Sequence, residues 1–147
     1  VELKSWLSEA HGDVDKAYQK ARAKAAWRKS VGRVTMSDCA RGFNSDGFSL
    51  ALGGLRDKRG RPIVYSHGLP RGSEQQIKSM TVYMQERVLE ACDASRGGVS
   101  VLTVIDCTQP SFRTPDRALR NGGIDVVAKY YPWNNKGTTV FVGVPPA

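Results

Sequence analysis

The sequence has few residues of the kinds that build metal centres and disulfide frameworks. It contains three cysteines and two histidines in 147 residues. The cysteines, Cys39, Cys92 and Cys107, are odd in number, far apart and never spaced as Cys-x-x-Cys, so they support neither a disulfide framework nor a zinc site. Free thiols are typical of a reducing compartment, which predicts a cytoplasmic protein.

Long apolar runs and several catalytic motifs are also missing. The longest uninterrupted apolar runs span only a few residues, far below the roughly 18 needed to cross a bilayer. Neither Gly-x-Gly-x-x-Gly nor the Walker pattern follows a predicted strand, and no Gly-x-Ser-x-Gly elbow is present. These absences argue against a membrane-spanning segment, a nucleotide enzyme and a serine hydrolase, and no cofactor is predicted.

The composition instead combines enough apolar residues for a packed core with a strong positive charge. Hydrophobic residues make up 40% of the chain, which suffices for one domain. The net charge of +8 predicts attraction to an anionic partner, either nucleic acid or an acidic membrane surface. Because the chain begins with Val1 and stops soon after its last predicted strand, we expect a piece of a longer polypeptide.

The first part of the chain predicts a short helix and a longer helix with a basic face. Leu3 to Ala10 is amphipathic, and Asp13 can cap the helix that follows. Lys16, Lys20 and Lys24 lie one turn apart, and each such like-charge pair costs about 0.2–0.5 kcal/mol. This face is either a solvated surface or a docking surface for anionic membranes. Apolar positions recur every three to four residues, which predicts one buried stripe along this helix; they are Val14, Ala17, Tyr18, Ala21 and Ala25.

The second part predicts alternating strands and helices. Strands are expected over Pro62 to Ser66, Val99 to Asp106 and Thr138 to Val144, because these runs are rich in β-forming residues. A capping box at Ser73 and Gln76 predicts a helix between the first two strands, and a second helix ends at Tyr131 after a break at residues 121–123. The order β-α-β-α-β predicts a mainly parallel α/β sheet with right-handed crossovers.

We therefore expect three parts. Residues 1–35 form a helical N-terminal subdomain, residues 36–56 an irregular connection with a short ordered segment near residues 48–52, and residues 57–147 the sheet unit.

Short motifs occur in a defined order along nearly the whole chain. They are Trp6-Leu7, Asp13-Val14, Ala17, Trp27-Arg28, Asp57-Lys58-Arg59-Gly60-Arg61-Pro62, Asp106 at a strand end, Tyr131-Pro132 at a helix end, and Gly143-Val144-Pro145. In this order and spacing the sequence resembles the CRAL-TRIO family of lipid-binding domains. Two of the motifs depart from the family pattern: Gly143 replaces Asn, and Trp133-Asn134 replaces the Glu-Arg of phosphatidylinositol-binding members.

The resemblance implies a lipid-binding or lipid-transfer domain without catalysis, cytoplasmic and peripheral to membranes. A hydrophobic lipid, such as a phospholipid, would lie in a pocket over the sheet. Thr103 matches a hydroxyl position of phosphatidylcholine-binding relatives, three residues before Asp106. Family members continue past the third strand with a mobile helix that gates the pocket, and a chain that lacks this gate could self-associate. The predicted lipid-contacting residues are Val64, Ser66, Val101, Thr103, Ile105 and Tyr131, and the predicted membrane-docking residues are Lys16, Lys20 and Lys24.

Two alternatives remain open at this point. Asp106 ends one predicted strand and His67 follows another, so with Cys107 or Ser111 they could form a small α/β enzyme's nucleophile, base and orienting acid. Capping by Asp106 and an exposed turn position for His67 are the simpler interpretations. A basic nucleic-acid-binding module is the other alternative, but aromatic residues do not alternate with the basic ones as stacking platforms would require, so no nucleic-acid partner is expected.

Overall fold

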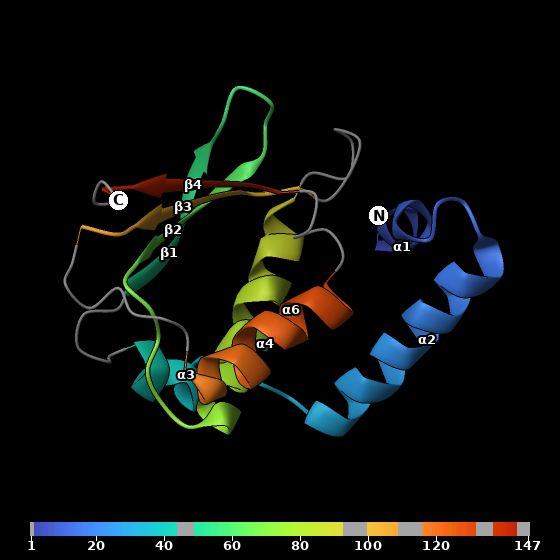
Figure 1. Ribbon diagram of the computed structural model, residues 1–147, viewed down its shortest axis with the longest axis horizontal. Helices are drawn as coiled ribbons and strands as arrows, with labels where there is room; N and C mark the ends of the chain where they lie inside the picture. The colour runs from blue at the N-terminus through green and yellow to red at the C-terminus, as the bar shows by residue number, and fades with distance from the viewer. Residues whose placement is uncertain (1, 44–48, 93–99, 109–115, 132–136, 144–147) are drawn as a thin grey trace.

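The computed structural model describes residues 2–43, 49–92, 100–108, 116–131 and 137–143 (Figure 1). It is a mixed structure of helices and one four-stranded sheet, so the predicted α/β class is confirmed. A helical hairpin, formed by α1 (Glu2–Glu9) and α2 (Val14–Val31), lies to one side of the sheet and its helices (Figure 1).

The hairpin is closed by a small apolar cluster. Asp13 caps α2 as predicted, because its side chain accepts a hydrogen bond from the Lys16 amide at 2.9 Å. Trp6 and Ala10 of the α1 side pack against Ala17. Because α1 is short and covers only this strip of α2, Val14 and Tyr18, which were predicted to be buried, are 68% and 59% exposed.

The sheet contains four strands whose spatial order follows the sequence. They are β1 (Ser49–Arg56), β2 (Pro62–His67), β3 (Leu102–Asp106) and β4 (Thr138–Val142). The strands β2, β3 and β4 are parallel, as predicted, and β1 pairs with β2 in the antiparallel direction.

The expectation of an irregular connection over residues 36–56 is wrong, although the short ordered segment expected near residues 48–52 coincides with the start of a strand. This segment contains the helix α3 (Met36–Phe43) and the strand β1. Glycine-rich sequence has a low intrinsic strand preference, so it is the pairing with β2 that stabilises β1, and that pairing is not visible in local sequence. The domain boundaries themselves stay predictions.

The turn between β1 and β2 explains the Asp-x-x-Gly-Arg-Pro motif in structural terms. The carboxylate of Asp57 accepts hydrogen bonds from the amides of Arg59 and Arg61, at 2.9 and 2.8 Å, and from Nε of Arg61 at 2.7 Å. Gly60 has φ of +78°, a conformation that glycine adopts without the strain that a side chain would cause. The motif therefore builds a tight turn that starts β2.

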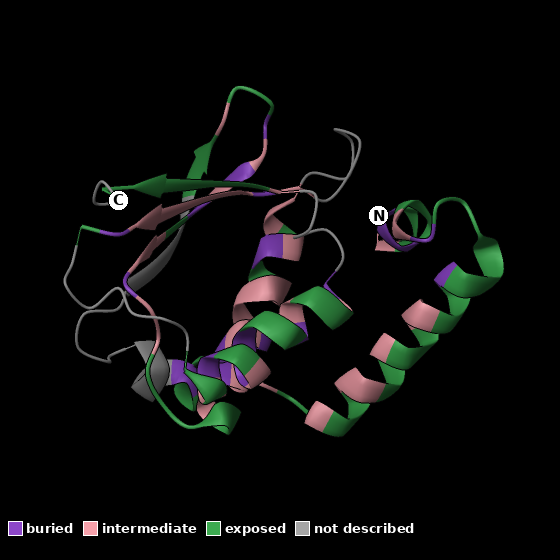
Figure 2. Ribbon diagram, viewed as in Figure 1, coloured by how far each residue is buried: buried purple, intermediate pink, exposed green. Residues whose placement is uncertain are grey.

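The helix α4 (Glu74–Ala91) lies at the centre of the core. It begins with the predicted capping box of Ser73 and Gln76. Its Val88 packs with Val64 and Val101 of the sheet unit, and its Met80 packs with Cys39 of α3. Figure 2 shows buried residues along α4 where it is enclosed by its neighbours.

The predicted break at residues 121–123 is absent. A continuous helical segment runs through α5 (Arg117–Leu119), the π-helical turn η2 (Arg120–Ile124) and α6 (Asp125–Tyr130). The glycines allow close packing instead of ending the helix, because a Cβ on Gly122 would lie 2.5 Å from the carbonyl oxygen of Glu74 in α4.

We predict that Gly122→Ala destabilises the protein by about 1–3 kcal/mol, the usual cost of overpacking. The better helix preference of alanine, worth about 1 kcal/mol at most, does not offset a clash with backbone. Urea unfolding measures the change. Gly54→Ala is the control, since a Cβ there meets nothing within 4 Å and the free energy of unfolding should change by less than about 0.5 kcal/mol. Equal effects of the two substitutions would contradict this account of η2.

Candidate ligand-binding face of the sheet

One side of the sheet is covered by helices. Val64, only 7% exposed, packs against Val88 of α4, and Val101 belongs to the same cluster. Paired residues of neighbouring parallel strands share a side of the sheet, and the register joins Val64 with Thr103 and Ser66 with Ile105. The five strand residues predicted to contact lipid are therefore on the side that α4 occupies, not on an open floor.

Tyr131 lies away from the sheet surface, in a cluster that joins α2 to α6. It is fully buried and packs with Val126, and the ring of Trp27 meets it edge-on at 6.2 Å. The ammonium of Lys24 lies 4.7 Å from its ring centroid. Burial raises the pKa of the Tyr131 hydroxyl well above its ordinary value. This residue holds the hairpin against the body of the protein.

The opposite side of the sheet is apolar and is not covered by any helix in the described part of the chain (Figure 1). We call this side the open face. Its middle carries the apolar residues Ile63, Tyr65, Leu102, Val104 and Val140, and by register Thr138 lies at its amino end and His67, Asp106 and Val142 at its carboxyl end. Tyr65 and Val140 are 38% and 42% exposed, and the other three residues of the middle are half-buried. Side chains alternate between the two sides of a strand, but the local sequence does not indicate which set faces the helices.

A polar pair lies at the carboxyl end of the open face. The Tyr65 hydroxyl donates a hydrogen bond to Oδ2 of Asp106 at 2.7 Å, and the Thr108 amide donates to Oδ1 at 2.9 Å. The Thr108 amide, followed by the Tyr65 hydroxyl, lowers the pKa of Asp106 to about 2. Asp106 is thus a permanent anion near neutral pH and closes the turn that follows β3.

The geometry gives little support to the enzymatic alternative. His67 and Asp106 are register partners on β2 and β3, so they are neighbours. However, a carboxylate with a pKa of about 2 is a weak base, and its hydrogen bonds to Tyr65 and Thr108 explain its position. Cys107 is buried, with its thiol 3.7 Å from the Ile105 carbonyl oxygen, and Ser111 lies outside the described residues.

The predicted membrane-docking lysines are not equally available. Lys20 pairs with Glu9 at 2.8 Å, and Lys24 pairs with Glu2. These acidic residues of α1 offset the repulsion between lysines on α2, which explains how the sequence tolerates the like charges. Lys16 is exposed, so of the three it presents its charge most openly to solvent.

No protein-family model matches the chain, and no curated protein matches its sequence. The likeness to CRAL-TRIO domains therefore stays a prediction from motifs. None of the helices in the described ranges is long and apolar enough to cross a membrane. Within the same ranges no three histidine, cysteine or acidic side chains gather as a metal site would require.

We predict that Tyr65→Phe raises the pKa of Asp106 from about 2 towards its ordinary value of 3.8, without reaching it because the Thr108 amide still donates. Carboxyl carbon NMR during a pH titration measures this shift. Because the pKa of Asp106 is lower in the folded than in the unfolded state, the ionised carboxylate stabilises the fold at pH values above the unfolded pKa. This contribution is lost as the pH falls through about 2. The wild type should therefore lose stability relative to Asp106→Asn between about pH 4 and pH 2. An unchanged pKa in Tyr65→Phe would show that the hydroxyl does not act on Asp106.

Proposed function

We propose that the protein binds a hydrophobic lipid on the open face of the sheet, without catalysis, and presents or transfers it between membranes. The observation that carries this proposal is the apolar open face with a hydrogen-bonded polar pair, Tyr65 and Asp106, at one end. An acyl chain would lie on the apolar part, and each methylene removed from water there contributes about 0.8 kcal/mol.

The arrangement of the open face suits an amphipathic ligand. Val104 and Val140 occupy neighbouring positions on β3 and β4, and Tyr65 occupies the matching position on β2. Asp106 lies two residues after Val104 on β3 and on the same side of the sheet. A ligand that lies along β3 would therefore pass from apolar contacts to the Tyr65 hydroxyl and the Asp106 carboxylate. An anion at that end favours a neutral or zwitterionic headgroup over an anionic one.

The family proposal is consistent with this geometry. Membership of the CRAL-TRIO family would place the lipid over a parallel sheet, and the parallel arrangement of β2, β3 and β4 supports that assignment. In this proposal the lipid lies on the open face. It does not contact Val64, Thr103 and the other strand residues that the sequence predicted to bind lipid. The net charge of +8 supports a peripheral encounter with anionic membranes.

We predict that Val140→Asp abolishes lipid retention, because it places a carboxylate in the apolar part of the open face. The full chain is incubated with vesicles of phosphatidylcholine and phosphatidylserine, re-isolated, and examined by native mass spectrometry for a bound lipid. Thr139→Asp is a matched control: it is exposed on the same strand, and its register partner Thr103 places it on the other side of the sheet. We expect the wild type and Thr139→Asp to retain one lipid.

The wild type is also incubated with vesicles that contain a sterol or a tocopherol, and failure to retain any of these lipids would overturn the proposal. Equal retention by Val140→Asp and Thr139→Asp would show that the lipid lies elsewhere.

We predict that Lys16→Gln weakens binding to phosphatidylserine-containing vesicles by about fivefold, the equivalent of about 1 kcal/mol for one basic residue near an anionic surface. Vesicle co-sedimentation at low salt measures the effect. Vesicles of phosphatidylcholine alone are the control, and the substitution should not change binding to them. An equal loss on both kinds of vesicle would contradict an electrostatic role for Lys16.

A further inference from the structure

The turn between β1 and β2 projects from the rest of the molecule (Figure 1). We call residues 55–61 the β1–β2 tip. These seven residues include four basic residues and one acid, which gives a net charge of +3. The apolar side chain of the tip, Leu55, is 74% exposed. One short segment therefore presents both positive charge and apolar surface to solvent.

A bulge in β1 explains why Leu55 is exposed. Between the register partners of Val64 and Pro62, β1 has three residues, 53–55, where β2 has one. Extra residues of this kind bend a strand and turn a side chain away from its regular direction. Leu55 has no register partner on β2, so its side chain is held outside the sheet.

Two arginines of the tip hold it in one conformation. The Arg61 guanidinium pairs with the Asp57 carboxylate at 2.7 Å, and both side chains are largely buried. Arg56 donates hydrogen bonds to the carbonyl oxygens of Gly60 and Ala91, at 2.9 and 2.7 Å, and so ties the tip to the C-terminal end of α4. A segment that is already ordered loses little conformational entropy when it binds a partner.

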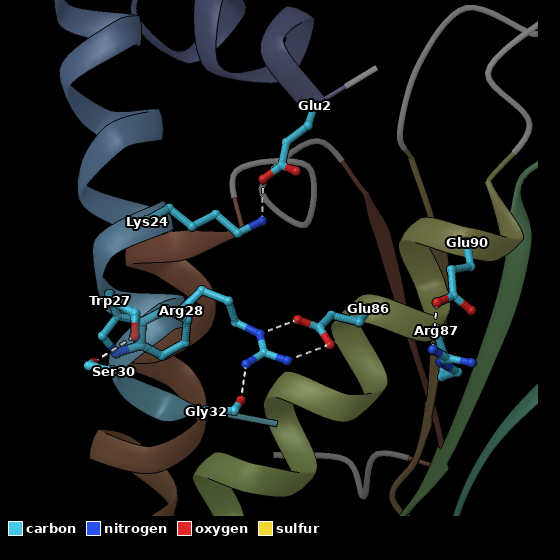
Figure 3. A network of polar contacts seen from close by, with 9 residues as sticks. All are labelled: Glu2, Lys24, Trp27, Arg28, Ser30, Gly32, Glu86, Arg87 and Glu90. Atoms are coloured by element: carbon cyan, nitrogen blue, oxygen red, sulfur yellow. Dashed lines mark hydrogen bonds and ion pairs between the residues drawn. The ribbon is translucent and has the colours of Figure 1, made fainter. Parts of the chain in front are cut away.

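The other two basic residues of the tip, Lys58 and Arg59, are directed to solvent. Both are exposed, and neither forms an ion pair with any residue that the structure describes. Several basic side chains of the helices, in contrast, have an acidic partner (Figure 3); the pairs are Lys24 with Glu2, Arg28 with Glu86 and Arg87 with Glu90. The charges of Lys58 and Arg59 are therefore available to an anionic partner.

The tip lies at the amino end of the open face. The strand β2 begins directly after it, and Arg61 donates a hydrogen bond to Oγ1 of Thr138, the first residue of β4, at 2.7 Å. The polar pair of Tyr65 and Asp106 is at the carboxyl end. A membrane that touches the tip would thus face the amino end of the open face, with the polar pair farther from the bilayer.

We propose that the β1–β2 tip docks the protein on anionic membranes. Leu55 inserts among the acyl chains, and Lys58 and Arg59 contact the anionic headgroups. This proposal rests on the proposed function, because docking at the tip brings the open face to its lipid. The lipid then moves along β3 with its headgroup first, towards Tyr65 and Asp106. An exposed leucine suits a membrane better than a nucleic acid, since it provides no aromatic ring for base stacking.

The test is co-sedimentation of the full chain with vesicles of phosphatidylcholine and phosphatidylserine at about 0.15 M salt. Lys58→Gln combined with Arg59→Gln should weaken binding about 25-fold, since each basic residue near an anionic surface contributes about fivefold. Leu55→Ser should weaken binding at least about fivefold, because serine lacks the apolar surface that insertion removes from water. Leu55→Trp should bind at least as tightly as the wild type, because tryptophan is favoured at membrane interfaces.

A matched pair of arginines controls for total charge. Arg117→Gln combined with Arg120→Gln also removes two exposed basic residues. The tip contacts α4 at Ala91, whereas η2 lies against Glu74 at the other end of that helix. The length of α4 separates the two places by about 25 Å, well beyond the Debye length of about 8 Å. This control should change vesicle binding by less than about twofold.

Leu3→Ser is the control for Leu55→Ser. Leu3 on α1 is similarly exposed, at 70%, and its loss should also change vesicle binding by less than about twofold. Equal losses in the tip variants and their controls, or unchanged binding by Leu55→Ser, would contradict docking at the tip. Tighter binding of the wild type to a polynucleotide than to the vesicles, lost in the tip variants, would assign the tip to nucleic acid instead.

A separate measurement distinguishes failure of docking from failure of the open face. Short-chain phosphatidylcholine below its critical micelle concentration reaches the open face without a vesicle. Native mass spectrometry should show that Leu55→Ser retains this lipid as the wild type does. If neither chain retains it, the proposed function fails, while the co-sedimentation result still decides whether the tip docks on membranes.

Discussion

When parallel strands lie side by side in the same order as in the chain, right-handed crossovers place every connecting helix on the same side of the sheet. The strands β2, β3 and β4 lie in this order, and α4 and α6 lie together on one side of them (Figure 1). As a result Val64 and Val101 pack against Val88 and become core. Among the described residues no helix covers the other side, and the proposed lipid site depends on this constraint.

The helix α4 joins the parts of the molecule to one another. It packs against the sheet through Val88 and against α3 through Met80, and η2 approaches it closely at Gly122. Its Glu86 also pairs with Arg28 of the hairpin. Because the C-terminal half of α2 makes this contact, while α1 lines the other wall, a cavity is left between the hairpin and α4.

The positive charge of the chain is distributed less simply than its sequence pattern indicates. The lysines of α2 lie one turn apart, which is typical of a basic surface, but α1 folds back and brings Glu2 and Glu9 to two of them. Lys24 is also drawn over the ring of Tyr131. Charges that are distant in sequence thus remove much of the basic face, and composition alone cannot indicate this.

Features that depend on residues close together in the chain could be predicted before the fold was known. Local hydrogen bonding accounts for the helix caps at Asp13 and Ser73. Residue preference accounts for the β-α-β-α-β order and for strands β2 and β4, which end near their predicted positions. Features that depend on contacts between distant residues became clear only from the fold. The strand β1 needs its partner β2, and the glycines of η2 continue a helix because α4 lies against them. The residues available to a ligand are likewise decided by which side of the sheet the helices bury, since an alternating strand pattern is equally compatible with either side.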